Sequence, residues 1–288
     1  MSQLDALEVE RIKEQTRRDW SGGAAAWRKW NPQLIVQSRA ATAAIIQAAG
    51  VTAGMQVLDL ASGTGEPALS LAEAVGSQGH VTATDLAIEM LLITEEYARQ
   101  RGLTNLTCKT ADAEALPFPD QSFDVVTCRF GVMFFPNPGQ ALRDIRRVLK
   151  PGGRAAFVAW GAFDQNPYFT TTVGVFMRHV QLPPPPPSTP TAFTFAKGGT
   201  LSAALQEAGF TQVQEETRSI PWGFPGRAVQ CWEYISEVTA PAFRRFFDAL
   251  APDQRAQVVS EVLQAIGQYD DGQYVNFPAV IVIGTGVC

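Results

Sequence analysis

A pair of glycines and an aspartate further along the chain form the first pattern here that could do chemistry. The run GTGEPA at residues 63–68 matches G-x-G-x-x-A and follows a short apolar stretch at 57–60. Glycines in such a turn permit positive φ and let a ligand approach the main chain. Asp85 comes twenty positions after Gly65, where a carboxylate can accept hydrogen bonds from both hydroxyls of a ribose. The pattern predicts a ribose-bearing ligand, which could be a nicotinamide dinucleotide or S-adenosylmethionine.

The charges next to this turn favour one of these ligands. A pyrophosphate binds at a helix N-terminus because the free N–H groups and the helix dipole attract anions. Here Glu66 stands in the first turn of the expected helix, and Asp59 ends the preceding strand. Two carboxylates would repel a pyrophosphate, whereas they suit a ligand that carries an α-ammonium and a sulfonium group. The charges therefore favour S-adenosylmethionine.

The elements that would hold these residues alternate along the chain. Strands are predicted at 55–60, 80–84, 105–109, 123–129 and 154–160, and helices at 66–75, 86–101 and 138–149. The strand segments are nearly continuous in apolar residues, as in parallel strands that are buried on both faces. The alternation predicts an α/β fold with a Rossmann-like, mostly parallel sheet of seven strands and helices on both faces.

The remaining segments divide the chain into four parts. Residues 1–49 are predicted to form an N-terminal helical cap, with helices at 4–18 and 34–49, ahead of a ligand-binding core at 50–160. Residues 161–198 are predicted to be a lid or linker that includes five consecutive prolines at 183–187, a stiff connector rather than an SH3 or WW ligand. Residues 199–288 should supply a helix at 199–210, two final strands that complete the sheet, and helices inserted at 225–270 as a lid.

Composition limits the class of protein. The chain has 288 residues, 46% of them hydrophobic and 18% charged, with a net charge of −5 and no basic stripe. Nucleic-acid binders usually carry such a stripe, so a nucleic-acid partner is not expected. Four cysteines without C-x-x-C spacing argue against a metal site and against a disulfide framework. With no apolar leader and no run of about 20 apolar residues, we expect a cytoplasmic protein without membrane insertion.

Four segments of the sequence resemble the successive motifs of class I S-adenosylmethionine-dependent methyltransferases. They read VLDLASGTGEPAL, TATDLAIEML, ADAEALPFPDQSFDVVTCRFGVMFF and LRDIRRVLKPGGRAAFVAW. The branch that they resemble is that of the ubiquinone/menaquinone-biosynthesis methyltransferases and their small-molecule relatives. The resemblance spans residues 50–160, and Ala61 stands where many relatives have a glycine.

The resemblance implies a role for particular residues. Asp59, Ala61, Gly63 and Gly65 would hold the methionine end of the donor, and Asp85 the ribose hydroxyls. Leu86 and Met90 would pack against the adenine, Asp112 would accept from its amino group, and Ala113 would offer a backbone N–H. Arg129, Phe130 and Val132 would lie near the sulfonium and the methionine carboxylate. Residues 149–153 would form a structural turn before the fifth strand.

The acceptor side is less defined in the sequence. An aromatic N-terminal segment closes the site in related enzymes, so one of Trp20, Trp27 and Trp30 is expected over the donor, with Trp30 favoured. Candidates for an apolar acceptor pocket are Phe163, Tyr168, Phe169, Phe193, Phe195, Trp222 and Phe224. His179 is the candidate general base or orienting group, whereas His80 precedes a strand and is expected to be structural.

The prediction is an S-adenosylmethionine-dependent methyltransferase (EC 2.1.1) that releases S-adenosylhomocysteine. It would act at O, N or C of a small apolar or aromatic metabolite, of the kind found in secondary metabolism. Two alternatives stay open: a nicotinamide-dependent oxidoreductase and a nucleic-acid or protein methyltransferase. The acceptor, the atom methylated and the oligomeric state are not predicted.

Overall fold

The fold is taken from a computed structural model that describes residues 5–180, 189–239 and 246–288. The proline run at 183–187, predicted to be a connector, lies outside the described residues.

A single seven-stranded sheet organises the described residues, in the order β3-β2-β1-β4-β5-β7-β6. Strands β1 to β5 are parallel, and β7 runs antiparallel to both β5 and β6. The predicted fold class is therefore confirmed, including the last two strands that complete the sheet. The strands are β1 (Gln56–Leu60), β2 (His80–Asp85), β3 (Leu106–Thr110), β4 (Phe123–Arg129), β5 (Leu149–Trp160), β6 (Thr211–Pro225) and β7 (Tyr274–Val287).

Strand order decides where a ligand can bind. The chain moves outward from β1 through β2 to β3, and then returns to place β4 on the other side of β1. In open α/β sheets the crevice outside the carboxyl ends of the strands at such a reversal is the usual ligand site. Here that position lies between the ends of β1 and β4.

The fifth strand begins earlier than the sequence predicts. Residues 149–153, interpreted as a turn, belong to β5, because Leu149 already pairs with Phe123 across an irregular register. Gly152 nevertheless has the structural role expected of it, since its φ of 78° is one that glycine adopts readily.

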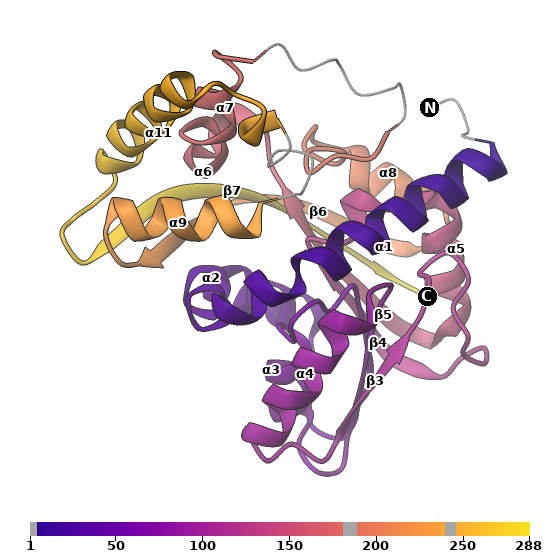
Figure 1. The fold of residues 1–288 in the computed structure, drawn as a ribbon. Coiled ribbons are helices and arrows are strands. Elements are labelled where there is room, and N and C mark those ends of the chain that lie inside the picture. The colour runs from indigo at the N-terminus through magenta and orange to yellow at the C-terminus, as the bar shows by residue number, and fades with distance from the viewer. Residues whose placement is uncertain (1–4, 181–188, 240–245) are drawn as a thin grey trace.

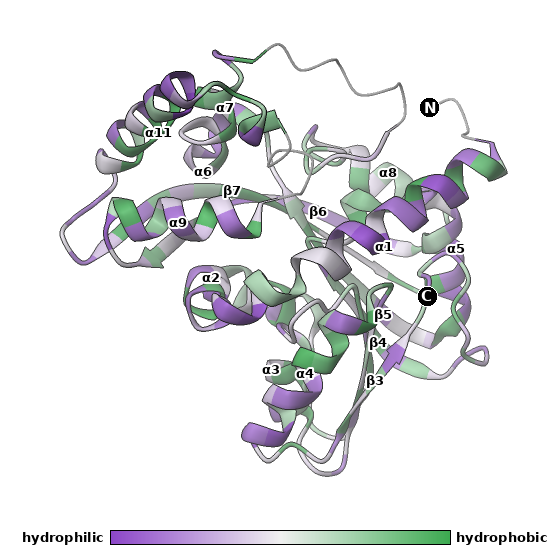
Figure 2. Ribbon diagram, viewed as in Figure 1, coloured by the Kyte–Doolittle hydropathy of each residue, from purple (hydrophilic) through white to green (hydrophobic). Residues whose placement is uncertain are grey.

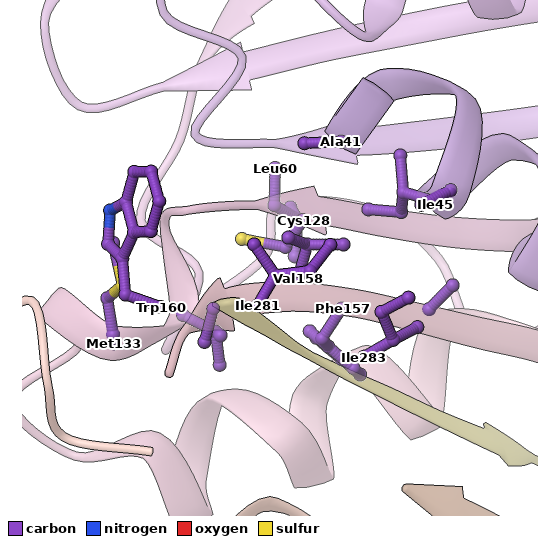
Figure 3. Packing of buried hydrophobic residues seen from close by; sticks show 14 of the residues in the cluster. Ala41, Ile45, Leu60, Cys128, Met133, Phe157, Val158, Trp160, Ile281 and Ile283 are labelled. Carbon is purple, nitrogen blue, oxygen red and sulfur yellow. The ribbon is translucent and has the colours of Figure 1, made fainter. Parts of the chain in front are cut away.

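Helices cover both faces of the sheet, as Figure 1 shows. One face carries α2 (Asn31–Ala49), α3 (Ala68–Val75) and α4 (Ile88–Gln100), and the other carries α5 (Pro138–Val148) and α8 (Thr200–Glu207). Apolar side chains fill the space between them. Figure 3 shows Ala41 and Ile45 of α2 facing residues of the strands, with Trp160 standing apart at one end of this cluster.

The first helix, α1 (Ala6–Lys29), is longer than predicted, because it continues through Gly22 and Gly23. Figure 2 shows hydrophilic residues along most of its length. Leu7, near its N-terminal end, is 84% exposed. Side chains of α1 contact α4, where Ser21 donates to Glu89 at 2.6 Å and Arg28 to Glu96 at 2.8 Å.

The predicted helical insertions are present in two places. After β5 come the short η2 (Phe163–Gln165), α6 (Pro167–Thr170) and α7 (Val173–Phe176), and between β6 and β7 come α9 (Ala228–Val238) and α11 (Pro252–Gly267). Phe243, part of the predicted helical region, lies outside the described residues. No helix within the described ranges is both long and apolar enough to pass through a bilayer.

Candidate functional site

A cavity of about 290 Å³ lies at the carboxyl ends of the parallel strands. Two parts of its wall differ in character, and residues of α1, α2 and the segment 131–136 line most of the rest. The loop half comprises residues 61–66, 84–90 and 111–114 of the wall, which follow β1, β2 and β3. The aromatic half comprises six rings on segments far apart in the sequence, those of Phe130, Trp160, Tyr168, Phe169, Trp222 and Tyr234.

The structure brings most of the predicted site residues to this cavity. Those that line it are Ala61, Gly63, Asp85, Leu86, Met90, Asp112, Ala113, Arg129, Phe130, Trp20, Trp27, Tyr168, Phe169 and Trp222. Those that lie elsewhere among the described residues are Asp59, Gly65, Trp30, Val132, Phe163, Phe193, Phe195, Phe224 and His179.

Asp85 fixes the shape of the loop half. One carboxylate oxygen accepts the Gly63 N–H at 3.0 Å, and the other accepts the Ala87 N–H at 3.0 Å. Burial raises the pKa of Asp85, and these backbone N–H groups oppose that shift. Because Gly63 has a φ of 55°, the turn after β1 can bend back to meet the end of β2. Asp85 thus joins two strand ends at the cavity wall.

Gly65 serves packing rather than the cavity. A Cβ added to it would lie 2.6 Å from the Leu69 side chain, and its φ is 116°. The glycine therefore lets α3 approach the turn closely. Ala61, where relatives often have glycine, itself adopts a φ of 52°.

Asp112 lies in a cluster of charges that the sequence analysis did not anticipate. Lys13 of α1 donates to Asp112 at 2.7 Å and lies 2.8 Å from a Glu114 carboxylate oxygen. Burial lowers the pKa of Lys13, but the two carboxylates outweigh it and raise that pKa overall. All three residues line the cavity.

Asp59 and Glu66, the two carboxylates expected to repel a pyrophosphate, do not present an uncompensated negative charge to the cavity. Asp59 is fully buried behind the wall, where Thr127 donates to it at 2.6 Å, and burial raises its pKa to about 7. Glu66 lines the wall, but Arg101 pairs with it at 2.9 Å and Ser70 donates to it. The two side chains disfavour a pyrophosphate less than the sequence indicates, because Asp59 is buried and Arg101, at the end of α4, is a counter-ion of Glu66.

Three residues that line the cavity, Arg129, Asn31 and Trp222, each have a buried N–H donor without a partner among the described residues. Arg129 donates to Thr42 at 2.9 Å and to the Glu66 carbonyl at 2.8 Å, which leaves its Nε without a partner. Asn31 accepts from Thr64 at 2.8 Å, and its Nδ2 has no partner. Buried donors are nearly always paired in native proteins. Both side chains line the cavity, so an anionic group of a ligand would satisfy them.

The rings of the aromatic half pack on one another. Phe130 stacks on Trp160 with centroids 4.4 Å apart, and Trp222 meets both edge-on at 5.7 and 4.8 Å. Tyr168 lies 6.2 Å from Trp222, and Phe169 lies 5.1 Å from Trp160. Burial raises the pKa of both Tyr168 and Tyr234, so neither phenol ionises near neutral pH.

Two predicted residues, Trp30 and His179, lie away from the cavity in surroundings of their own. Trp30 is buried against Phe224 and Tyr234 and donates to Glu237 at 2.9 Å. Trp20 and Trp27, rather than Trp30, are the N-terminal tryptophans that reach the cavity. His179 contacts Glu261 of α11 at 3.1 Å, so it joins two inserted helical segments instead of facing the cavity.

Several lining residues were missed because nothing local in the sequence marks them. Lys13, Asn31, Trp160 and Tyr234 all reach the wall, each from a different element. The one usable signal was the spacing of Lys13, Thr16, Trp20 and Trp27, which places them on one face of a helix. The predicted helix stops at residue 18 and so excludes Trp20 and Trp27, which is why this spacing was not recognised.

Known proteins were compared with the whole chain. The model of the ubiE/COQ5 methyltransferase family matches residues 35–181, just over half of the 288 residues. The chain belongs to this family. The resemblance described from the sequence motifs is thereby confirmed. Among curated members, the ubiquinone/menaquinone biosynthesis C-methyltransferase UbiE of Shewanella sediminis is 44% identical over 110 residues. That match covers 38% of this chain and 44% of the relative, so the chain spans less than half the length of the curated relatives it matches.

Solved structures agree on the fold. The YcgJ protein of Bacillus subtilis has a TM-score of 0.55 at 22% identity, covering 85% of this chain and 97% of that one. The [4+2]-cyclase SpnF has a TM-score of 0.50 at 20% identity, covering 85% of this chain and 79% of that one. These likenesses show the fold alone. The second carries a name for a different reaction, so the fold by itself does not identify the reaction here.

Proposed function

We propose that this protein transfers a methyl group from S-adenosylmethionine to a small apolar or aromatic acceptor. The observation that carries the proposal is the position of Gly63, Asp85 and Asp112 on one cavity wall, in a chain of the ubiE/COQ5 methyltransferase family. The UbiE relatives are named as C-methyltransferases. Oxygen, nitrogen and carbon all remain candidate acceptor atoms in this chain.

The lining residues fit the donor group by group. Asp85 would accept from the ribose hydroxyls, and Asp112 from the adenine amino group, with the Ala113 N–H beside it and Leu86 and Met90 against the base. The donor also carries an α-carboxylate. The unpartnered Nε of Arg129 and Nδ2 of Asn31 supply two N–H donors for such an anion, at the end of the loop half where the methionine moiety would lie.

Asp59 and Gly65 have a supporting role in this proposal. Neither lines the cavity: Asp59 accepts from Thr127 and so joins β1 to β4, and Gly65 lets α3 pack closely on the turn after β1. The bound donor supplies an activated methyl group on a sulfonium, and the protein's task is to align the acceptor with it and exclude water. Phe130, where the two halves meet, would lie near the sulfonium, to which an aromatic face is attractive.

The aromatic half indicates the chemical class of the acceptor. Its six rings include no side chain that is charged near neutral pH, since Tyr168 and Tyr234 stay protonated. Desolvating a charged acceptor there would cost several kcal/mol without a partner. We therefore infer an acceptor with a flat ring that is uncharged or whose charge is delocalised. A nucleic acid or a protein is not the acceptor in this proposal.

The described part of the cavity wall offers no histidine or cysteine as a general base. Proton removal would then depend on the acidity of the acceptor itself or on solvent, and His179 is not expected to take part. The predicted cytoplasmic location stays a proposal, in line with the four cysteines, which are all unpaired thiols.

The test combines binding and turnover. Calorimetry should show S-adenosylhomocysteine binding in the micromolar range, a free energy of about −8 kcal/mol, with no comparable binding of NADH. Methyl-labelled donor incubated with the protein and a panel of phenols, quinols and aromatic amines should then label one class. Binding of NADH alone would favour an oxidoreductase. Firm donor binding without any labelling across the panel and a metabolite extract would favour a reaction that only uses the fold, as the name of SpnF illustrates.

A further inference from the structure

The inner face of α1 forms part of the cavity wall, and one charged residue on it stands out. Lys13, Thr16, Trp20 and Trp27 follow one another at spacings of three, four and seven residues, so they share a face of the helix. All four line the cavity. Trp20 also packs against Phe134 at 6.3 Å, on the opposite side of the wall. Helix α1 is thus a wall of the site, not only a neighbour of it.

The Lys13 ammonium group is held by carboxylates of the loop after β3. It lies 2.7 Å from Asp112 and 2.8 Å from Glu114, and its side chain is 13% exposed. The two carboxylates are themselves tied together and to the next element. The Glu114 N–H donates to Asp112 at 2.9 Å, and the Asn137 N–H at the start of α5 donates to Glu114 at 2.7 Å. One cation therefore joins α1 to the loop that bears the proposed adenine contact.

We propose that Lys13 is a positioning residue that fastens α1 over the loop half and so sets how long the bound donor stays. The proposal rests on the function proposed above, because it takes the ligand of the loop half to be S-adenosylmethionine. While Lys13 stays in place, Asp112 keeps its orientation toward the adenine amino group, and the face bearing Thr16 and Trp20 covers the donor. Release of the donor requires the ammonium group to part from both carboxylates.

Another ion pair of α1, between Arg28 and Glu96, is more exposed than the one at Lys13. Arg28 pairs with Glu96 at 2.6 Å, but the two side chains are 58% and 31% exposed. Exposed pairs of this kind contribute little, because water screens and solvates both charges. The Glu114 side chain is only 6% exposed, so loss of Lys13 would leave a buried carboxylate without its cation, which is strongly unfavourable. The position of helix α1 over the cavity therefore depends most on its N-terminal half, where Lys13 contacts Asp112 and Glu114.

The experiment measures dissociation of S-adenosylhomocysteine from the full chain. Lys13→Met keeps an unbranched side chain of nearly the same length and removes the charge, and Lys13→Arg keeps the charge. Arg28→Met removes a charge from the same helix at an exposed pair and is the matched control. We expect dissociation about tenfold faster in Lys13→Met, within about threefold of the unsubstituted chain in Lys13→Arg, and within about twofold in Arg28→Met.

Two further readouts separate this role from a general loss of stability. Raising NaCl from about 50 to about 500 mM should speed release several-fold in the unsubstituted chain and leave Lys13→Met unchanged, since only the former separates these charges on opening. Hydrogen exchange should rise in α1 of Lys13→Met without ligand, while the core strands stay protected. If Lys13→Met does not fold, the double variant Lys13→Met with Glu114→Gln removes the cation and the buried charge together and carries the same test.

The outcomes are distinguishable. Equal dissociation rates for Lys13→Met and the unsubstituted chain, or equal acceleration by Arg28→Met, would overturn the role of Lys13 and leave the proposed function intact. Failure of the unsubstituted chain to bind S-adenosylhomocysteine would overturn both.

Discussion

The two halves of the cavity wall are built in different ways. The loop half comes from three successive strand-to-helix or strand-to-loop connections within residues 61–114, and each connection carries its own local pattern. The aromatic half is assembled from residues as far apart in the sequence as Phe130 and Tyr234, which folding brings to one cavity wall. Proteins that share the loop half can therefore differ widely in the aromatic half, and with it in the acceptor.

The halves also differ in electrostatics. The loop half holds carboxylates at Glu66, Asp85, Asp112 and Glu114, and Lys13 of α1 supplies a cation beside the last two. The aromatic half contributes two phenols whose pKa is raised by burial, and no carboxylate. Charge and hydrogen bonding would fix the donor, whereas shape and ring contacts would fix the acceptor. Substitutions in one half should thus leave binding to the other half largely unchanged.

The largest expected effect of a substitution is in the loop half. Asp85→Ala should weaken S-adenosylhomocysteine binding at least about 100-fold, roughly 3 kcal/mol, because it removes charge-assisted hydrogen bonds to two ribose hydroxyls. Calorimetry measures the affinity, and thermal unfolding checks that the variant is folded. Asp120→Ala, which removes a carboxylate that is 70% exposed, is the control and should bind normally. An affinity within threefold of the unsubstituted chain would contradict the ribose role.

Asp59 predicts a pH dependence of stability that originates beneath the loop half. Its pKa is raised from 3.8 to about 7 in the folded chain because the carboxyl group is fully buried. Between these values the folded state keeps a proton that the unfolded state releases, so stability is present at low pH and is lost as pH rises toward 7. From pH 5 to pH 7 the loss from this group is roughly 2 kcal/mol.

Asp59→Asn should remove that loss, since the amide does not ionise and can still accept from Thr127. The difference in the free energy of unfolding between the variant and the unsubstituted chain should rise from pH 5 to pH 7 and level off above it. Denaturant unfolding at several pH values measures this difference. A difference that is constant over the whole range would show that Asp59 is ionised throughout in the folded chain.

The features of the fold and site that the sequence could predict are those of the loop half, where local patterns mark the residues. The parallel strands, Gly63, Asp85 and Asp112 were predictable because each is marked by neighbours within a few positions. The two final strands that complete the sheet were also recognised, and they are β6 and β7. What local patterns report is the backbone path and the residues at its turns.

The rest was not predictable because it depends on packing between distant segments. Trp30 was expected to cover the donor, but its indole N–H donates to Glu237 of α9 and its side chain does not line the cavity. His179 was the obvious base in a chain with two histidines, and Glu261 of α11 holds it elsewhere. Lys13 drew no notice among the charges of the first helix. In each case the partner lies about 80 to 210 positions away along the chain.

A smaller effect is expected in the aromatic half. Trp222→Phe keeps a ring beside Phe130 and Trp160 but removes the indole N–H and leaves a gap. We expect the acceptor KM to rise about fivefold, close to 1 kcal/mol, with S-adenosylhomocysteine affinity within about twofold of the unsubstituted chain. Steady-state kinetics with the acceptor found by labelling, together with calorimetry, checks both values. Equal losses in the two measurements would mean that the halves do not act separately.

The smallest expected effect is a rescue between two substitutions at the contact of Ala61 with Gly131. A Cβ added to Gly131 would lie 2.5 Å from the Ala61 Cβ and 2.7 Å from the Cys128 sulfur. Gly131→Ala should therefore cost about 2 kcal/mol through overpacking. Ala61→Gly should relieve part of this, since it removes one of the two clashing atoms and frees a residue with a φ of 52° from strain.

A double-mutant cycle on the free energy of unfolding measures the coupling, for which we expect up to about 1 kcal/mol of rescue. Strict additivity would mean that Cys128 alone sets the limit at Gly131. Rescue would instead explain why an alanine is tolerated at position 61, where many relatives have glycine: Gly131 across the contact leaves room for its methyl group. The absence of a side chain at Gly131 would then be the reason that Ala61 can have one.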